Sequence, residues 1–473
     1  MNIGNDLALI ENVTFDEMQL GQSASLTRTL RAEDIQLFAV MSGDVNPAHV
    51  DPEFARDSMF HEVIGHGMWG GALISTVLGT QLPGPGTIYL NQSLRFSRPV
   101  TLGDTLTVSV TVREKQSEKR RVVFDCLALN HRGDKVISGT AEVLAPAEKI
   151  RRPRIAMPSI TIDNRSDRLR RLLDKVAGLP PLALAVVHPC DEASLRGALQ
   201  ARDLGIAQPI LVAPVSRLQA LAAQHGLDLA GCPLVDAPHS HAAAEVAVQL
   251  VRAGRAHALM KGSLHTDELM TEVVQRDGGL RTARRVSHVF VLDVPHHPRP
   301  LLITDAAINI APDLEAKADI IRNAIDLAHA LGIAEPRVAL LAAVETVNAR
   351  MQATLDAAAL CKMAERGQIA GARLDGPLAF DNAISLAAAR TKGIESPVAG
   401  QADILLVPNL EAGNMLAKQL EYLGDALAAG VVLGARVPIV LTSRADSAET
   451  RVASTAVAQL MAQAACAARR VAP

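Results

Sequence analysis

Residues 66–78 read HGMWGGALISTVL, a segment that is small or apolar on every side of a helical projection. Such a segment predicts a helix that is buried all round. Its glycines leave the N–H groups of the first turn uncovered, and an uncovered helix N-terminus stabilises negative charge, including a developing oxyanion. We therefore expect a central helix whose first turn, beginning near Gly67, can face a ligand.

The stretch that follows this helix alternates between apolar and polar residues. The alternation is found in five segments, 87–90, 93–96, 105–112, 122–129 and 136–143. It predicts strands with one exposed face, and the turn signals at 103–104 and 132–134 favour an antiparallel sheet. The first part of the chain is therefore expected to be an α+β domain in which a sheet wraps around the helix.

A short polar loop precedes the helix and reads Asp44-Val-Asn46-Pro47-Ala-His49. Pro47 fixes its own φ and keeps Asn46 out of the helical region, so an acid and an imidazole lie on one bent segment. This arrangement suits general acid–base chemistry. The alternative is an Asx-type turn in which Asp44 or Asn46 caps the next helix and His49 is only packed or exposed.

The motifs Asp44-x-Asn46-Pro47-x-His49 and His66-Gly67-Met68 together resemble those of the MaoC-like (R)-specific enoyl-CoA hydratases, which have the hot-dog fold. The resemblance covers about residues 10–145. It implies that Asp44 and His49 activate a water that adds to a trans-2-enoyl-CoA, giving an (R)-3-hydroxyacyl-CoA. The Gly67 amide would stabilise the enolate oxygen, and Asn46 and His66 would bind the substrate. A hot-dog thioesterase or dehydratase remains the alternative.

A chain of 473 residues is too long for one ordinary domain. Between Pro146 and Pro158, prolines and like charges interrupt the periodicity, which is typical of a linker. We therefore predict a first domain over residues 1–147, a linker over 148–160 and a second domain over 161–473.

The second domain contains short apolar runs separated by alanine-rich segments. The runs 182–187, 209–212, 288–292, 301–304, 338–341, 404–407 and 438–442 predict buried parallel strands, and the segments 191–201, 316–331 and 415–429 predict helices between them. This order is typical of an open α/β sheet with helices on both faces, whose ligands lie at the carboxyl ends of the strands.

Polar residues follow these predicted strands in several loops. They are Lys261, Asp305, Asn309, Asp375, Asp381, Asn414, Ser443, Arg444 and Asp446. If the strands are parallel, the loops converge, and Arg444 could grip a phosphate with both arms of its guanidinium while Ser443 adds a hydroxyl. For each loop taken alone, the alternative is turn chemistry combined with a helix cap.

Together with the segments 279–288 and 396–400, these loops resemble the phosphate acetyl/butyryltransferase family, a two-lobed open-sheet fold, over about residues 165–470. The resemblance implies that the thiolate of coenzyme A attacks the carbonyl of an acyl phosphate without a covalent enzyme intermediate. Ser443 and Arg444 would orient the phosphate and carbonyl. Asp446 is the expected carboxylate that eases thiol deprotonation, with Glu449 as the alternative. The expected substrate-binding residues are Lys261, Arg281, Arg285, Asp305, Asn309, Asp375, Asp381 and Asn414.

The two resemblances predict a bifunctional acyl-CoA enzyme, a lyase and a transferase on one chain. The alternative is a hydratase whose second domain is a non-catalytic module that senses acyl-CoA. Coenzyme A thioesters, acyl phosphates and phosphate would be substrates, with no permanently bound cofactor. Members of both families usually form homo-oligomers, so we expect a dimer or a larger assembly.

Composition restricts the partners. A formal net charge of −3 and an aromatic content of 2% argue against binding to nucleic acid or an anionic membrane, and no apolar run is long enough to span a bilayer. The N-terminus lacks a secretory signal, so we expect a cytoplasmic location.

The five cysteines are scattered, and His61 and His66 are five residues apart, on different faces of any helix. We therefore expect neither disulfides nor a metal site.

Overall fold

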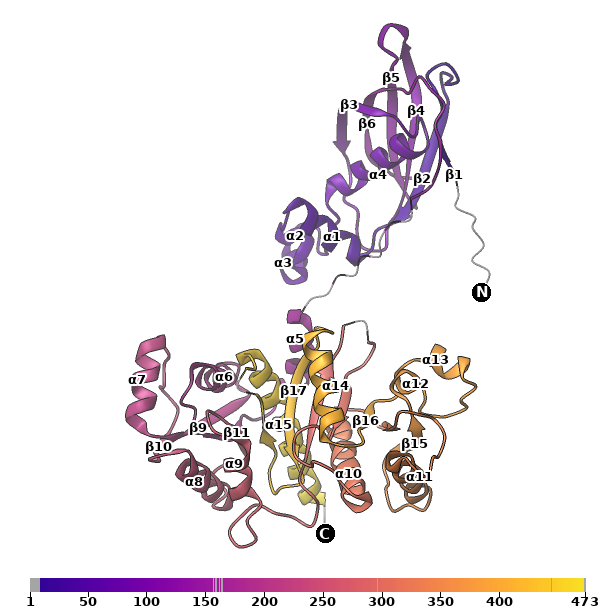
Figure 1. Ribbon diagram of the computed structural model, residues 1–473. Helices are drawn as coiled ribbons and strands as arrows, with labels where there is room; N and C mark the ends of the chain where they lie inside the picture. The colour runs from indigo at the N-terminus through magenta and orange to yellow at the C-terminus, as the bar shows by residue number, and fades with distance from the viewer. Residues whose placement is uncertain are drawn as a thin grey trace. The chain divides into compact units, whose positions relative to one another are not determined.

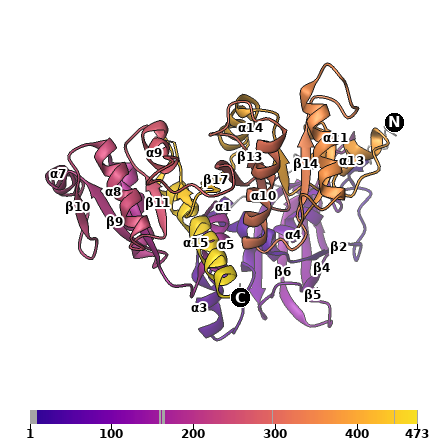
Figure 2. The same ribbon diagram turned by 90° about the horizontal axis from the view of Figure 1, so that it is seen from below.

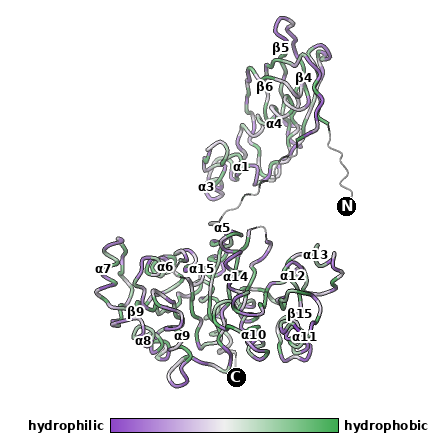
Figure 3. Tube along the Cα trace, viewed as in Figure 1, coloured by the Kyte–Doolittle hydropathy of each residue, from purple (hydrophilic) through white to green (hydrophobic). Residues whose placement is uncertain are grey.

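The computed structural model describes residues 9–471 except 156, 158, 159, 161, 163, 164, 296 and 444. The chain divides into two compact units, Met1–Asp163 and Asn164–Pro473. Figures 1 and 2 show the elements of each unit, and Figure 3 shows hydrophobic segments inside both. Among the described residues, no helix is both long and apolar enough to cross a membrane.

The first unit is a hot-dog fold, as predicted. Its antiparallel sheet has the order β2-β4-β5-β6-β3, formed by β2 (Ser23–Thr29), β3 (Ile88–Phe96), β4 (Thr105–Gln116), β5 (Arg121–Asn130) and β6 (Lys135–Leu144). The helix α4 (Gly67–Thr80) packs on this sheet, and Ile74, Val77 and Leu78 on it are fully buried. The small residues let the sheet approach closely, since a Cβ at Gly70 would lie 2.4 Å from Cδ1 of Ile137.

Shorter elements complete this unit. They are β1 (Leu9–Glu11), α1 (Ala32–Ser42), α2 (Pro47–Val50), α3 (Pro52–Asp57), η1 (Ser117–Lys119) and β7 (Arg151–Pro153). The strands β1 and β7 pair antiparallel, so the segment 148–160, predicted as a linker, contains a strand of the first unit. Residues 156, 158 and 159 of that segment lie outside the described residues.

The second unit contains an eleven-stranded mixed sheet. Its order is β10-β9-β8-β11-β18-β17-β12-β13-β16-β14-β15. The strands are β8 (Leu182–Val187), β9 (Ala207–Ala213), β10 (Leu234–Asp236), β11 (Ala258–Lys261), β12 (Ser287–Asp293), β13 (Leu301–Thr304), β14 (Arg337–Leu341), β15 (Arg373–Leu378), β16 (Ile404–Leu406), β17 (Leu427–Leu433) and β18 (Ile439–Val440).

Helices cover both faces of this sheet, as predicted. They are α5 (Arg165–Val176), α6 (Glu192–Asp203), α7 (Val215–His225), α8 (Ser240–Arg252), α9 (Thr266–Val273), α10 (Leu314–Ala330), α11 (Gln352–Glu365), α12 (Phe380–Ile384), α13 (Leu386–Thr391), α14 (Leu410–Tyr422) and α15 (Ala448–Val471). One hydrophobic core lies under α6, α10, α11 and α15. Two further cores lie on the other face, one under α8 and α9 and one under α12, α13 and α14.

The prediction of uniformly parallel strands is wrong. The strand β12 is antiparallel to both of its neighbours, β13 and β17, and β17 is antiparallel to β18. As a result, β11 and β18 run opposite to β13, β14, β15 and β16. The helix predicted to reach residue 429 ends at Tyr422, and the apolar run that follows forms the central strand β17.

Candidate active sites

In the first unit, the loop from Ser42 to Asn46 is held by its own hydrogen bonds. Gly43 ends α1 in the left-handed region with a φ of 76°. The Ser42 hydroxyl accepts the N–H of Asp44 at 3.2 Å, and a carboxylate oxygen of Asp44 accepts the N–H of Asn46 at 3.3 Å. The Asn46 side chain caps α2 by accepting the N–H of Ala48 at 3.1 Å. Asn46 therefore has the structural role that the turn interpretation gives it.

His49 has its ring orientation fixed by one backbone contact. Its Nδ1 lies 2.8 Å from the carbonyl oxygen of Ile64. Because a carbonyl can only accept, Nδ1 carries the proton and Nε2 keeps a free lone pair. His49 is half-buried and its neighbour Asp44 is exposed, so a molecule from solvent can reach both side chains.

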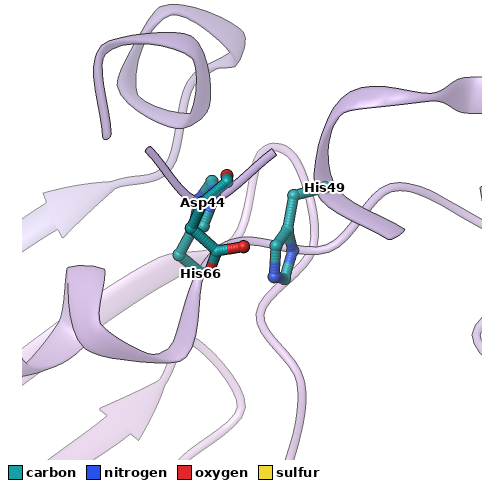
Figure 4. A group of neighbouring side chains, drawn as sticks. All are labelled: Asp44, His49 and His66. Atoms are coloured by element: carbon teal, nitrogen blue, oxygen red, sulfur yellow. The ribbon is translucent and has the colours of Figure 1, made fainter. Parts of the chain in front are cut away.

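His66 lies behind this pair. It is buried, and its Nε2 donates to the carbonyl oxygen of Asp44 at 2.9 Å. Its ring centroid lies 4.1 Å from that of His49, and its Nδ1 has no hydrogen-bond partner among the described residues. Figure 4 shows the Asp44 carboxylate directed toward the imidazole of His49. His66 thus supports the loop that carries the acid.

Asp44, His49 and His66 offer three ligand atoms that all lie within 4.8 Å of one another. A water molecule fits such a group. Two imidazoles and a carboxylate could also ligate a divalent metal ion, although one nitrogen of each ring already contacts a carbonyl. The group can therefore hold either a water molecule or a divalent metal ion.

The first turn of α4 adjoins this group, because His66 is its N-cap and Gly67 its first residue. The His66 side chain makes no capping hydrogen bond, and both Gly67 and Met68 are exposed. A Cβ at Gly67 would lie 3.3 Å from the Phe96 ring, so a larger residue at this position would crowd the exposed start of α4. The uncovered amides can stabilise negative charge on a ligand.

In the second unit, Asp305 and Asn309 are buried and bound to each other. The Asp305 carboxylate accepts the N–H groups of Ala307, Ile308 and Asn309 at 3.0, 3.1 and 3.0 Å. Arg285 donates its Nε to the side-chain oxygen of Asn309 at 2.8 Å. Asp305 and Asn309 therefore shape the loop, whereas the exposed Arg285 can still reach a ligand.

The loop that joins β18 to α15, called the Ser443 loop below, contains a buried carboxylate. Asp446 is 9% exposed and accepts the N–H of Ser443 at 2.6 Å. Burial raises the pKa of Asp446, and the Ser443 N–H, Arg451, Lys418 and Lys261 oppose the rise. Arg444 lies outside the described residues.

A recess of about 270 Å³ lies beside this loop and is lined by Asp446, Glu449 and Glu421 among others. Burial, and then the charge of Asp446, raise the pKa of Glu421. Both carboxylates considered as the base from the sequence, Asp446 and Glu449, border this recess.

The remaining predicted residues are spread over the sheet. Lys261 is buried at the end of β11, and its charge acts on Asp446. Asn414 donates to the Ala306 carbonyl at 3.2 Å, and Asp375 accepts the N–H of Gly376 at 2.8 Å. Asp381 forms an ion pair with Lys392, with 3.3 Å between Oδ2 and Nζ. Arg281 is exposed.

The expectation that all these loops leave one edge of a parallel sheet is wrong. Lys261 ends β11 and Ser443 follows β18, and both strands run opposite to β13, β15 and β16, which precede Asp305, Asp381 and Asn414. The structure therefore groups Lys261 with the Ser443 loop, and it joins Asp305, Asn309 and Arg285 in a second group.

Two residues near the Ser443 loop were not predicted from the sequence. Arg451 is 2% exposed and donates to the carbonyl oxygens of Asp446, of Ser447 at 3.3 Å and of Ser443 at 3.1 Å. Glu421 lies on α14. A signal for Arg451 was present, since it stands with Thr450, Ser454, Thr455 and Gln459 in an alanine-rich segment.

Comparisons with known proteins agree with this division. Residues 239–459 match the family model described as phosphate acetyl/butaryl transferase, and residues 15–127 match the MaoC like domain. The chain is 64% identical over 292 residues to a phosphate acetyltransferase of Rhizobium meliloti, covering 62% of this chain and 92% of that protein. It is 44% identical over 297 residues to a phosphate butyryltransferase of Clostridium beijerinckii, and this match covers 63% of this chain and 98% of that protein.

Solved structures give matches for both units. A branched-chain phosphotransacylase from Enterococcus faecalis is 30% identical, with a TM-score of 0.53, and the match covers 59% of this chain and 98% of that one. The R-hydratase PhaJ1 from Pseudomonas aeruginosa is 46% identical, with a TM-score of 0.32, and the match covers 33% of this chain and 100% of that one.

Proposed function

Because this chain belongs to the phosphate acetyl/butyryltransferase family and also carries a MaoC-like domain, we propose that it catalyses two reactions of acyl-CoA substrates. Its second unit is a phosphate acyltransferase, and acetyl or butyryl groups are the proposed acyl groups. Its first unit hydrates trans-2-enoyl-CoA to (R)-3-hydroxyacyl-CoA. Coenzyme A thioesters, acyl phosphate and phosphate are substrates of these reactions.

The hydration uses Asp44 and His49 together. His49 Nε2 accepts a proton from a water held by the Asp44 carboxylate as the water oxygen adds to C3 of the substrate. His49 then returns that proton to C2, so the elements of one water are added. The enolate oxygen that forms transiently on the thioester accepts from the Gly67 amide at the start of α4.

The observation that carries this proposal is the group formed by Asp44, His49 and His66 at an uncapped helix N-terminus. The contact of His49 Nδ1 with the Ile64 carbonyl leaves Nε2 as the nitrogen that can accept a proton. An imidazole with this tautomer can accept a proton without first losing one.

The acyl transfer uses the Ser443 loop. The thiol of coenzyme A passes its proton to Asp446, the thiolate attacks the carbonyl of the acyl phosphate, and phosphate leaves with the P–O bonds intact. Ser443 and Arg444 orient the phosphate. The raised pKa of Asp446 supports its role, because a carboxylate with a higher pKa is a stronger base.

The test uses the full chain and two assays, loss of the enoyl absorbance of crotonyl-CoA and formation of acetyl or butyryl phosphate from the matching acyl-CoA. Asp44→Asn and His49→Gln should each lower hydration by about 10²–10⁴-fold and leave acyl transfer unchanged. The exposed Asp57 in α3 provides the matched control, Asp57→Asn, which should change neither rate.

Asp446→Asn should give the reverse pattern, with acyl transfer lowered and hydration retained. Normal hydration by Asp44→Asn would disprove the role of the first unit. Release of free thiol from crotonyl-CoA would identify a thioesterase instead. If the wild-type chain forms no acyl phosphate, the second unit is a non-catalytic acyl-CoA sensor.

A further inference from the structure

The second unit contains a cavity of about 780 Å³ that none of the predicted site residues lines. It lies among α5, the carboxyl end of β12, the segment 297–300 and the amino ends of β14, β16 and β17. Its volume falls within the range of about 300–1,000 Å³ that is typical of small-molecule sites. The size alone is compatible with a metabolite.

This cavity lies on the face of the sheet that α10 and α15 cover. Val291 and Ala429 line it, and both belong to the core under those helices. Asp446 interacts with Lys418 and Glu421 of α14, which packs on the other face. Leu427 lies between the two regions, because it lines both the cavity and the recess beside Asp446.

The cavity wall carries an excess of positive charge. Among the described residues that line it, five side chains are cationic and three are acidic. Two cations are already paired, Arg171 with Asp293 at 2.8 Å and Arg299 with Asp403 at 3.3 Å. Arg337 and Lys175, which form no ion pair with a described residue, together match the charge of a phosphate monoester, which carries about −1.5 to −2 at pH 7.

Arg337 has the guanidinium that is best placed to receive such an anion. It is the first residue of β14 and only partly buried, and its side chain makes no hydrogen bond or ion pair with any described residue. Lys175 lies on the same wall and donates to the Leu331 carbonyl at 3.0 Å, which leaves two further N–H donors. A planar guanidinium can bind two phosphate oxygens at once.

His297 gives a second indication of a ligand. Its Nε2 is buried and has no partner among the described residues. Burial, and then the charge of Arg299, lower the pKa of His297. A buried ring nitrogen without a partner costs free energy, and a polar group in the cavity would remove that cost.

We propose that this cavity binds a nucleoside monophosphate, with the phosphate on Arg337 and Lys175 and the base against the apolar wall. Leu172, Val291 and Ile333 form much of that wall. Apolar side chains accommodate a planar heterocycle better than a hydroxyl-rich sugar, which would lose hydrogen bonds to water there. His297 Nε2 can contact a polar atom of the base.

The experiment measures binding of adenosine 5′-monophosphate to the full chain by titration calorimetry. Arg337→Gln and, independently, Lys175→Met should each weaken binding at least tenfold. The exposed Arg366 at the end of α11 provides the control, since Arg366→Gln should bind like the wild type. Thermal unfolding of each variant verifies that it is folded, and two independent variants guard against the misfolding of one.

Two further titrations identify the site. Adenosine, which lacks the phosphate, should bind at least tenfold more weakly than the monophosphate, and saturating coenzyme A should leave monophosphate binding in place. The proposal is overturned if the wild type does not bind adenosine 5′-monophosphate at millimolar concentration. Equal binding by Arg337→Gln and Lys175→Met, or displacement by coenzyme A, also overturns it, the latter by assigning binding to the catalytic site.

Discussion

Arg451 holds the Ser443 loop from beneath. Three carbonyl oxygens of that loop accept from its guanidinium, and a Cβ at Gly197 would lie 2.8 Å from the Arg451 stem, so the side chain is tightly enclosed. Arg451→Met should lower the free energy of unfolding of the second unit by about 3–5 kcal/mol, because three loop carbonyls lose the donors of a buried guanidinium. Urea unfolding measures this, with Arg366→Met as the control.

If Arg451 also positions Ser443 and Asp446, the same variant should lower kcat for acyl transfer more than it changes KM, under conditions where it is folded. Equal stability of Arg451→Met and the wild type would contradict the proposed support. An unchanged kcat in a destabilised variant would show that Arg451 is only structural.

His288 on β12 makes folding sensitive to acid. It is fully buried, and burial lowers its pKa from 6.5 to about 4, although Asp305 opposes the shift. Between these values the unfolded chain binds a proton that the folded chain does not. The second unit should therefore lose about 3 kcal/mol of stability as the pH falls from 6.5 to about 4.

Urea unfolding at several pH values checks this loss. His288→Gln should remove that part of the pH dependence, whereas His241→Gln, at an exposed position, should not. A pH dependence that is the same in His288→Gln and the wild type would show that other groups cause the acid sensitivity.

At the residue scale, short motifs were more informative than isolated residues. The spacing of Asp44, Asn46 and His49 predicted a bent loop, and of the two caps that the turn interpretation allowed, the structure shows Asn46. The support by Arg451 was not predicted, although polar residues flank it in the sequence, because its contacts with the Ser443 loop depend on how α15 packs. The catalytic roles themselves stay predictions.

The pairing of β3 with β6 depends on one glycine. A Cβ at Gly139 would lie 1.8 Å from the carbonyl oxygen of Ser93, which is backbone and cannot swing away. Gly139→Ala should therefore destabilise the first unit by about 3 kcal/mol or more. Trp69, which is buried in α4 and is the single tryptophan of the chain, reports this unfolding by fluorescence.

Gly79, near the end of α4, provides the matched control. An added Cβ meets nothing within 4 Å there, so Gly79→Ala should stabilise the helix by about 0.5–1 kcal/mol. If Gly139→Ala unfolds at the same urea concentration as the wild type, the close approach of β3 to β6 is not required.

Strand positions were easier to predict than strand directions. The runs 182–187 and 301–304 coincide with β8 and β13. The direction of β12 was not predictable, because a strand buried on both faces gives the same apolar run whether it is parallel or antiparallel. The strand β2 was missed because SASLTRT is largely polar and exposed, and its pairing with β4 comes from distant residues.

The hydrophobic cores of the two units are separate: the described residues of the first unit form one core and those of the second form three. Calorimetry should therefore show two unfolding transitions. Leu78→Ala should lower only the transition that Trp69 fluorescence follows, and Leu195→Ala only the other, each by about 2–5 kcal/mol, since both side chains are fully buried. A joint shift of both transitions in either variant would indicate that the units unfold together.

Because both units lie on one polypeptide, they are always made in equal amounts. Every round of translation yields one copy of each unit, so transcriptional control cannot alter their ratio. The balance between the two proposed turnover rates can then be changed only by mutation or by a ligand that acts on one unit. Such a ligand would tune metabolic flux through this protein without any change in its abundance.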